Sequence, residues 1–251
     1  MYLSDISILP KTIHSSWISF FTDVIVLKLK KIETEIANEE LVTPSVEKML
    51  RFFELDLASI KVIIIGQDPY PQEGVATGRA FEVGNLESWF DKFPNTSLKN
   101  IVRALYALNE NNSILKFNEI KEEIKKGKFK IISPKKLFKH WEKQGVLLIN
   151  SSFSVAVGNP GSHAKIWESF TNELLRYINS QVADAHWMLW GAYAKSKVKK
   201  LTIKNKSISR HPMLCSNHED DFLFGKVNHF QLFKDKIDWG VEFENDKVLE
   251  K

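Results

Sequence analysis

Three largely apolar segments, 61–66, 146–150 and 186–191, stand out along the chain, and each ends at a turn-forming or polar residue. Runs of this kind are typical of strands buried inside a parallel sheet. A fourth strand is expected at 203–210, and segments with helical spacing of apolar residues separate the strands. The alternation predicts an α/β fold in a single domain, with a central four-stranded parallel twisted sheet flanked by helices on both faces.

Helical spacing of apolar residues predicts the elements between the strands. The expected helices cover 16–39, 46–55, 97–108, 111–130, 134–144, 166–178 and 227–237, with a lysine-rich one after the third strand. Ser45, Ser97 and Ser162 are the expected N-caps, because a serine hydroxyl accepts a hydrogen bond from a free amide of the first turn. Residues 1–15 show no periodic pattern and are expected to form an irregular arm.

Polar or backbone-exposing residues follow the carboxyl end of each predicted strand. The first strand leads to Asp68, the second ends on Asn150, the third reaches Gly191 and the fourth reaches His211. In open α/β sheets these strand ends lie at one edge, which is where ligands bind. An acid, an amide, an exposed backbone and an imidazole are therefore expected to form one site.

The loop after the first strand is expected to be rigid. Gly66 allows a sharp turn, while Pro69 and Pro71 restrict the backbone that follows. Asp68 and Tyr70 would then be held in fixed positions. The same stretch also fits an ordinary strand-to-helix turn in which Asp68 caps a helix, so the loop alone does not decide its role.

The length of 251 residues and the mass of 29.0 kDa fit one α/β domain over residues 1–251. The single cysteine, Cys215, excludes an internal disulfide framework and four-cysteine metal sites, and it suits a reducing cytoplasm. Residues 1–17 lack the pattern of a signal peptide, and no apolar run reaches membrane-spanning length. We expect a cytoplasmic protein without a metal ion, a cofactor or a membrane association.

The net charge of +4, from 35 Lys and Arg against 31 Asp and Glu, is compatible with a nucleic-acid partner without requiring one. Basic residues nevertheless crowd the stretch before His211. They are Lys195, Lys197, Lys199, Lys200, Lys204, Lys206 and Arg210. This basic cluster is interpreted either as a solvated helix face or as a surface close to phosphate groups.

Several short motifs, in the same order along the chain, resemble those of the family-1 uracil-DNA glycosylases. They are Gly66-Gln67-Asp68-Pro69-Tyr70, Gly78-Arg79-Ala80-Phe81, Ser97-Leu98-Lys99-Asn100-Ile101, the stretch from Trp141 to Asn150, Gly161-Ser162-His163-Ala164, Trp190-Gly191, His211-Pro212 and Asn228-His229-Phe230. The likeness runs from about residue 17 to residue 233. It implies that uracil is flipped out of DNA and that its N-glycosidic bond is hydrolysed, which leaves an abasic site and starts base-excision repair.

The resemblance assigns the chemistry of bond cleavage to Asp68 and His211. The ionised Asp68 carboxylate would stabilise the oxocarbenium charge of the sugar and position the attacking water, and neutral His211 would donate a hydrogen bond to uracil O2. Asn150 would read uracil, because its amide offers one acceptor for N3–H and one donor for O4. Cytosine presents the reverse pattern at these two positions.

Three more residues would shape the uracil pocket. Phe81 would stack on the base, and Tyr70 would lie against C5, where thymine carries its methyl group. Gln67 would contribute its backbone and its shape more than its side chain.

Contacts to DNA phosphates are expected by resemblance at Ser97, His163 and Gly191. The chain departs from the family pattern at Pro71, where the family usually has histidine, and at Ala192, which replaces the serine of a Gly-Ser loop.

A third departure follows His211-Pro212, where the family generally reads Ser-Pro-Leu-Ser and this chain reads Met213-Leu214-Cys215-Ser216. Cys215 falls in register with the leucine that the family inserts into the helix as a wedge. Met213, Leu214 and Cys215 are therefore all candidates for DNA contact and for wedging.

The expected partner is uracil-containing DNA, single- or double-stranded, bound by a monomer, and a DNA-mimicking inhibitor protein would be a further partner. Two other functions fit parts of the pattern. A non-enzymatic DNA-binding or replication-accessory protein would share the fold, although the presence of Asp68, Asn150 and His211 argues against it. A small-molecule nucleotide enzyme lacks support because no known glycine-rich phosphate loop is present.

Overall fold

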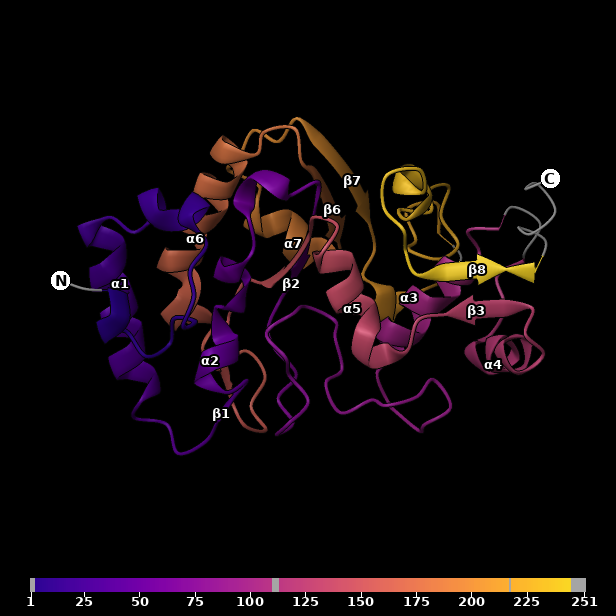
Figure 1. Ribbon diagram of the computed structural model, residues 1–251, viewed down its shortest axis with the longest axis horizontal. Coiled ribbons are helices and arrows are strands. Elements are labelled where there is room, and N and C mark those ends of the chain that lie inside the picture. Colours follow the sequence, from indigo (N-terminus) through magenta and orange to yellow (C-terminus); the bar gives the residue numbers. More distant parts are fainter. Residues whose placement is uncertain (1–2, 110–112, 217, 245–251) are drawn as a thin grey trace.

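A parallel four-stranded sheet forms the centre of the computed structural model (Figure 1), which describes residues 3–109, 113–216 and 218–244. Its strands are β2 (Val62–Gly66), β4 (Val146–Asn150), β6 (His186–Trp190) and β7 (Asn205–Ser209), in the spatial order β4-β2-β6-β7. All three pairings are parallel, so the carboxyl ends of the strands meet at one edge. The predicted fold class and its four strands are confirmed.

The remaining elements are short or helical. The α-helices are α1 (Asp23–Ile36), α2 (Val46–Met49), α3 (Thr96–Tyr106), α4 (Phe117–Lys125), α5 (Pro134–Glu142), α6 (Ala164–Gln181) and α7 (Ala192–Lys197). Short 3₁₀ segments cover Leu3–Asp5, Ser15–Phe20, Arg51–Glu54, Leu57–Ser59, Pro212–Leu214 and Gln231–Phe233. Two antiparallel strand pairs join β1 (Val42–Thr43) to β5 (Val155–Ala156) and β3 (Phe129–Ile131) to β8 (Val241–Phe243).

Helices cover both faces of the sheet because successive strand residues point to opposite sides. Ile63 and Ile65 of β2 pack into one core, to which α1, α6 and α7 contribute. Ile64 packs into a second core, formed with α3, α4 and α5. Figure 1 shows α1 and α6 to the left of the sheet and α3 and α4 to its right. The sheet is thereby held rigidly between two apolar layers, as its apolar sequence predicted.

Several helix boundaries differ from the predictions. The predicted helix 46–55 divides into α2 and a 3₁₀ turn, with Ser45 at the N-cap position but without a capping hydrogen bond. Helix α3 begins at Thr96 with Asn95 as its N-cap, so Ser97 already lies inside the helix. The Ser162 hydroxyl accepts a hydrogen bond from the Ala156 backbone N–H at 2.8 Å and therefore fixes a loop instead of capping α6.

The predicted closing helix at 227–237 is wrong. Only the 3₁₀ turn Gln231–Phe233 is helical there, and side chains of Trp239 and Asn228 form hydrogen bonds with the backbone of Phe230. The Trp239 indole donates to the Phe230 carbonyl at 2.9 Å, and the Phe230 backbone N–H donates to the Asn228 side chain at 3.1 Å. The segment still packs back on the sheet, since Phe230 and Ile237 are buried in the second core.

The predicted helix at 111–130 is shorter than expected. Residues 110–112 lie outside the described residues, and α4 occupies only Phe117–Lys125 before the chain enters β3. The lysines of this region therefore lie on α4, on β3 and in the short segments beside them.

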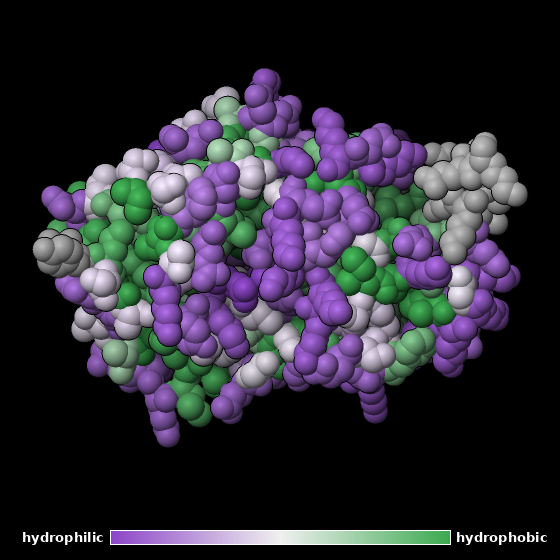
Figure 2. Space-filling model, in the orientation of Figure 1, coloured by the Kyte–Doolittle hydropathy of each residue, from purple (hydrophilic) through white to green (hydrophobic). Residues whose placement is uncertain are grey.

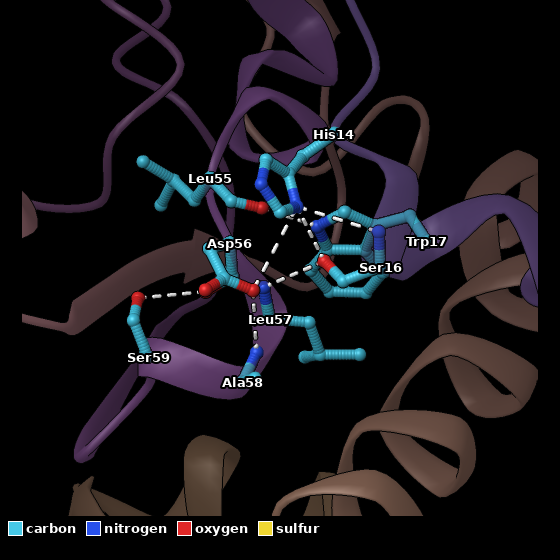
Figure 3. A network of polar contacts seen from close by, with 8 residues as sticks. All are labelled: His14, Ser16, Trp17, Leu55, Asp56, Leu57, Ala58 and Ser59. Carbon is cyan, nitrogen blue, oxygen red and sulfur yellow. Dashed lines mark hydrogen bonds and ion pairs between the residues drawn. The ribbon is translucent and has the colours of Figure 1, made fainter.

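The N-terminal segment is irregular apart from its two 3₁₀ turns, and it is anchored to the chain that leads into β2 (Figure 3). The Trp17 indole donates to the Leu55 carbonyl at 2.8 Å, and the Leu57 backbone N–H donates to the Ser16 hydroxyl at 2.9 Å. Asp56 accepts from the Ala58 backbone N–H at 3.0 Å and closes the turn before β2. These contacts fix the start of the central strand.

On the face drawn in Figure 2, hydrophilic residues run through the middle and hydrophobic residues show in groups to either side. Within the described ranges, no helix is long and apolar enough to cross a membrane.

Candidate active site

A pocket of about 250 Å³ lies at the carboxyl edge of the sheet. Asp68, Tyr70, Phe81, Asn150 and His211 all line this pocket, which therefore brings together the residues predicted for cleavage and for uracil recognition. They come from the loop after β2, the segment before α3, the end of β4 and the residue pair after β7. Gln67, Ser97 and Met213 also line it.

Asp68 is half-buried in the wall of the pocket, and its carboxylate accepts a hydrogen bond from the Gly161 backbone N–H at 2.6 Å. Burial raises the pKa of Asp68 above its ordinary value, and the hydrogen bond from Gly161 opposes that rise. The contact holds one carboxylate oxygen in place, so the second oxygen can face a ligand. A helix-capping role for Asp68 is not seen.

His211 lies on the opposite wall, and its Nδ1 accepts a hydrogen bond from the Met213 backbone N–H at 3.1 Å. Burial lowers the pKa of His211, which favours the neutral ring. With Nδ1 accepting, the proton of the neutral ring lies on Nε2. Gly191 packs against this ring at φ 96°, and a Cβ there would lie 2.9 Å from the His211 Cβ.

Asn150 is placed by the register of the sheet, in which it pairs with Gly66. Its side chain is buried, and a Cβ on Gly66 would lie 2.2 Å from its Oδ1. Among the described residues, none forms a hydrogen bond with the Asn150 amide. Both its donor and its acceptor are therefore available to a ligand in the pocket.

Two aromatic side chains enclose the space between these polar groups. Phe81 has a ring centroid 5.3 Å from that of Trp190 and 5.8 Å from that of His211. Its φ of 67° is in the left-handed region, which is rare for a bulky residue. Tyr70 packs at the edge of the second core, and burial raises the pKa of its hydroxyl to about 12, so that the hydroxyl stays protonated.

Gln67 is an exposed residue. Its backbone carbonyl accepts hydrogen bonds from the backbone N–H groups of Ser151 at 3.2 Å and Ser152 at 3.0 Å. These bonds tie the loop after β2 to the loop after β4. The geometry agrees with a backbone role for Gln67.

The residues predicted to contact DNA separate into two groups. Met213 and Leu214 project from the 3₁₀ turn after His211, with 57% and 55% of their surface exposed. Cys215 turns inward, where its thiol donates to the Pro212 carbonyl at 3.2 Å and burial raises its pKa to about 11. Cys215 is half-buried, whereas Met213 and Leu214 are exposed, so its geometry suits a wedge less well than theirs. Ser97 lies at the rim of the pocket.

His163 is also wrong as a direct phosphate contact, because its side chain is completely buried. Its Nδ1 shares a hydrogen bond with the Ser154 hydroxyl at 2.8 Å, and its Nε2 lies 3.8 Å from the Glu39 carboxylate. Burial lowers the pKa of His163. The residue stabilises the loop that carries Gly161 instead of facing solvent.

The basic cluster does not surround the pocket. Lys204 precedes β7, at the opposite edge of the sheet, and its ammonium lies 2.6 Å from the Asp184 carboxylate. Lys197, Lys199 and Lys200 line a separate groove between α6 and α7. The structure supports the interpretation of these residues as a solvated surface.

Known proteins with related sequences and structures identify the family. A family model described as the uracil DNA glycosylase superfamily matches residues 52–237. A uracil-DNA glycosylase of Mycoplasmopsis pulmonis is 33% identical over 241 residues, which cover 90% of this chain and 97% of that protein. This chain belongs to the uracil-DNA glycosylase superfamily.

Solved structures of the superfamily share the fold. UNG from Nitratifractor salsuginis superposes with a TM-score of 0.69 at 23% identity, over 89% of this chain and 91% of that one. A variant of mimivirus UNG in complex with UGI superposes with a TM-score of 0.68 at 24% identity, over 94% and 93% of the two chains.

Two backbone groups of this superfamily member escaped the sequence analysis. The N–H of Gly161 holds Asp68, and the N–H of Met213 holds His211. The motif around Gly161 pointed to the right segment, but no residue type marks which backbone atom reaches across the pocket. Within the described ranges, no three His, Cys, Asp or Glu side chains gather into a group that could hold a metal ion.

Proposed function

We propose that this chain is a uracil-DNA glycosylase that takes uracil out of the DNA helix, hydrolyses its N-glycosidic bond and releases free uracil, which initiates base-excision repair. The observation that carries the proposal is the single pocket that joins Asp68, Asn150 and His211. Residues 1–251 act as one catalytic domain.

Asp68 serves the sugar side of the reaction. The glycosidic bond breaks with its electron pair on uracil N1, which leaves positive charge on the deoxyribose ring. The ionised Asp68 carboxylate, fixed by Gly161, stabilises that charge and orients the water whose oxygen bonds to C1′. The proton that this water loses balances the one that the uracil anion takes up to become free uracil. A carboxylate that is held before the reaction needs no rearrangement as the charge develops.

His211 serves the base side. Its Nε2–H donates to uracil O2, where negative charge gathers as the base leaves as an anion. A neutral donor suits this role, because an imidazolium facing the pocket would also attract and partly neutralise the Asp68 carboxylate. The lowered pKa of His211 and the hydrogen bond to its Nδ1 support the assignment.

Asn150, Tyr70 and Phe81 select the base. The Asn150 amide accepts from N3–H and donates to O4, a pairing that uracil fits and cytosine does not. Tyr70 closes the C5 side against the methyl group of thymine. Phe81 stacks on the flipped base, and the exposed Gln67 contributes its backbone.

DNA reaches the pocket across the rim formed by Ser97, Met213 and Leu214, whereas Gly191 is buried behind His211 with its N–H bonded to the Ser209 carbonyl. The exposed Met213 and Leu214 occupy the place of the base that leaves the stack, in single- or double-stranded DNA. Because the DNA backbone is anionic, its electrostatic attraction to the protein is screened by salt. DNA binding should therefore weaken as the salt concentration increases.

The remaining partners follow from the same proposal. The protein acts as a monomer in the cytoplasm, without a membrane partner. An inhibitor protein that mimics DNA would cover the same rim. The complex of mimivirus UNG with UGI supports that last proposal.

The deciding experiment measures uracil release from oligonucleotides that contain one uracil, single- and double-stranded, for the wild-type chain and for Asp68→Asn. The wild type is expected to release uracil, and Asp68→Asn to be about 10³-fold slower with DNA binding retained. The matched control Asp184→Asn makes the same change on an exposed carboxylate and should keep full activity. Full turnover by Asp68→Asn would contradict the assignment, and activity on free deoxyuridine alone would favour a small-molecule enzyme.

A further inference from the structure

The backbone of Phe81 is held in a conformation that its own side chain disfavours. It is the only non-glycine residue with a positive φ in the described part of the chain. Left-handed backbone is strained for a bulky L-residue and persists only where the surroundings enforce it. The residues beside Phe81 should therefore contain the constraint.

A buried ion-pair network clamps the turn on both sides of Phe81. The Arg79 guanidinium donates to the Glu82 carboxylate at 3.0 Å and to the Glu142 carboxylate at the end of α5. The Thr77 hydroxyl donates to the same oxygen of Glu82 at 2.5 Å. Phe81 thus lies between two residues that are ion-paired to each other, and one of them is tied to a helix of the core.

A second set of contacts fixes the start of this turn. Arg51 donates to the Thr77 carbonyl at 3.1 Å. Gly78 has a φ of 87° and packs so closely that a Cβ would lie 2.0 Å from the Lys48 carbonyl. The turn is therefore held from its first residue to its last.

The network has features that stability alone does not explain. The side chains of Arg79, Glu82 and Glu142 are only 6%, 7% and 10% exposed. Charges removed from water to this degree pay a desolvation cost, and apolar side chains of similar volume are often equally stable in their place. Hydrogen-bonded ion pairs are directional and apolar contacts are not, because an ion pair fixes the angle as well as the distance between two groups.

We propose that Arg79 is a positioning residue, whose two ion pairs hold the turn 77–82 so that Phe81 keeps its ring over the pocket, against Trp190 and His211. The inference rests on the proposed glycosylase function, because it assigns Phe81 the stack on the flipped uracil. Arg79 itself lines the pocket wall but acts through Phe81.

The test combines Arg79→Met with Phe81→Ala in a double-mutant cycle on a uracil-containing oligonucleotide. Arg79→Met keeps the length of the side chain and removes both ion pairs. It should lower kcat/KM about tenfold, the size of one lost base–aromatic stack, and Phe81→Ala should lower it by a similar factor. In the Phe81→Ala background, Arg79→Met should cause no further loss, and a crystal structure of Arg79→Met should show Phe81 with a negative φ.

Stability is separated from positioning by two more variants. The triple variant Arg79→Met/Glu82→Met/Glu142→Met removes every buried charge of the network, so its free energy of unfolding should match the wild type while its kcat/KM stays low. Lys135→Met removes an exposed ion pair between α5 and Glu87 and should keep both properties unchanged.

The outcomes distinguish this inference from the proposed function. A wild-type chain without uracil release overturns both. The positioning role alone is overturned if the wild type releases uracil and Phe81→Ala loses activity while Arg79→Met keeps full activity. Losses from Arg79→Met and Phe81→Ala that multiply in the double variant also overturn it, because they would act independently.

Discussion

The backbone N–H of Met213 donates a hydrogen bond to Nδ1 of His211 over 3.1 Å, so a residue with an exposed side chain also sets the tautomer of the histidine. The same loop is tied to α3, because the Asn100 side chain donates to the Pro212 carbonyl at 2.6 Å. A displacement of Met213 by DNA would therefore move the hydrogen-bond donor of the His211 imidazole, and the contact with α3 would oppose that displacement.

Activity should be retained at pH 6.5 and lost in acid. Burial lowers the pKa of His211 below 6.5, so the ring stays neutral until the pH falls through that lowered value. Burial raises the pKa of Asp68 above 3.8, so its carboxylate is protonated earlier in acid than an exposed aspartate. A profile of kcat/KM against pH should decline between pH 6.5 and 3.8. His211→Gln should be about 10²-fold slower, and its pH profile should show only the decline that comes from protonation of Asp68. A rate that rises as the pH falls below 6.5 would contradict the neutral role of His211.

Gly66→Ala should inactivate the chain with little change in fold. The added Cβ would lie 2.2 Å from the Asn150 Oδ1, and it would push the amide out of place. A misplacement of about 1 Å costs on the order of 10²-fold in rate. Gly127→Ala adds a methyl group where there is open space, at a φ of 74° that Gly66 does not share, and should keep activity although its backbone is more strained. Retained activity in Gly66→Ala would show that Asn150 need not hold its present position.

The amide itself can be tested by reversing one of its hydrogen bonds. Asn150→Asp should begin to release cytosine, because a protonated carboxyl can donate where cytosine N3 accepts. Release assays on matched uracil and cytosine oligonucleotides measure the change. A variant that is inactive on both bases would require another residue for base selection.

Tyr70→Ala should admit thymine to the pocket. One methyl group in a closed apolar wall changes discrimination by about 10–200-fold, which sets the size of the expected gain. Tyr70→Phe keeps the ring and should still exclude thymine. Thymine release from A·T and G·T oligonucleotides would measure both variants, and equal exclusion by Ala and Phe would place the steric barrier elsewhere.

Met213→Ala and Leu214→Ala should slow release from duplex DNA more than release from single strands, because only the duplex needs its stack filled. We expect a difference of about tenfold for the residue that enters the helix. Leu232→Ala removes another apolar side chain, 48% exposed, and serves as the control. Equal slowing on both substrates would assign these residues to binding instead of base extrusion.

Three of the four strands could be predicted because buried parallel strands have an apolar signature, whereas β7 is a polar strand at the end of the sheet whose burial alternates. The parallel order of the strands then fixes the edge at which they end. Asp68, Asn150 and His211 follow directly from those strand ends. The closing helix failed because Phe230, Phe233 and Ile237 recur at helical spacing and yet pack into the second core from a loop. Periodicity does not distinguish the two.

The rim could be predicted only in part. Cys215 and His163 stand at the expected places in their motifs, yet both side chains turn inward. A sequence position gives the order of residues along a loop but not the direction of each side chain. The Gly161 amide and the ion pairs of Arg79 depend on chain segments that meet only after folding.

Strand β2 is hydrogen-bonded to β4 on one side and to β6 on the other. Amides in such a strand exchange with solvent last, because their release requires the whole sheet to open. The loop with Asp68 and Tyr70 follows directly after this strand, whereas Met213 and Leu214 lie on a single exposed turn. The two sides of the pocket should thus differ in the opening that exposes their amides: the loop with Asp68 and Tyr70 opens only when the sheet opens, whereas the turn with Met213 and Leu214 can open locally.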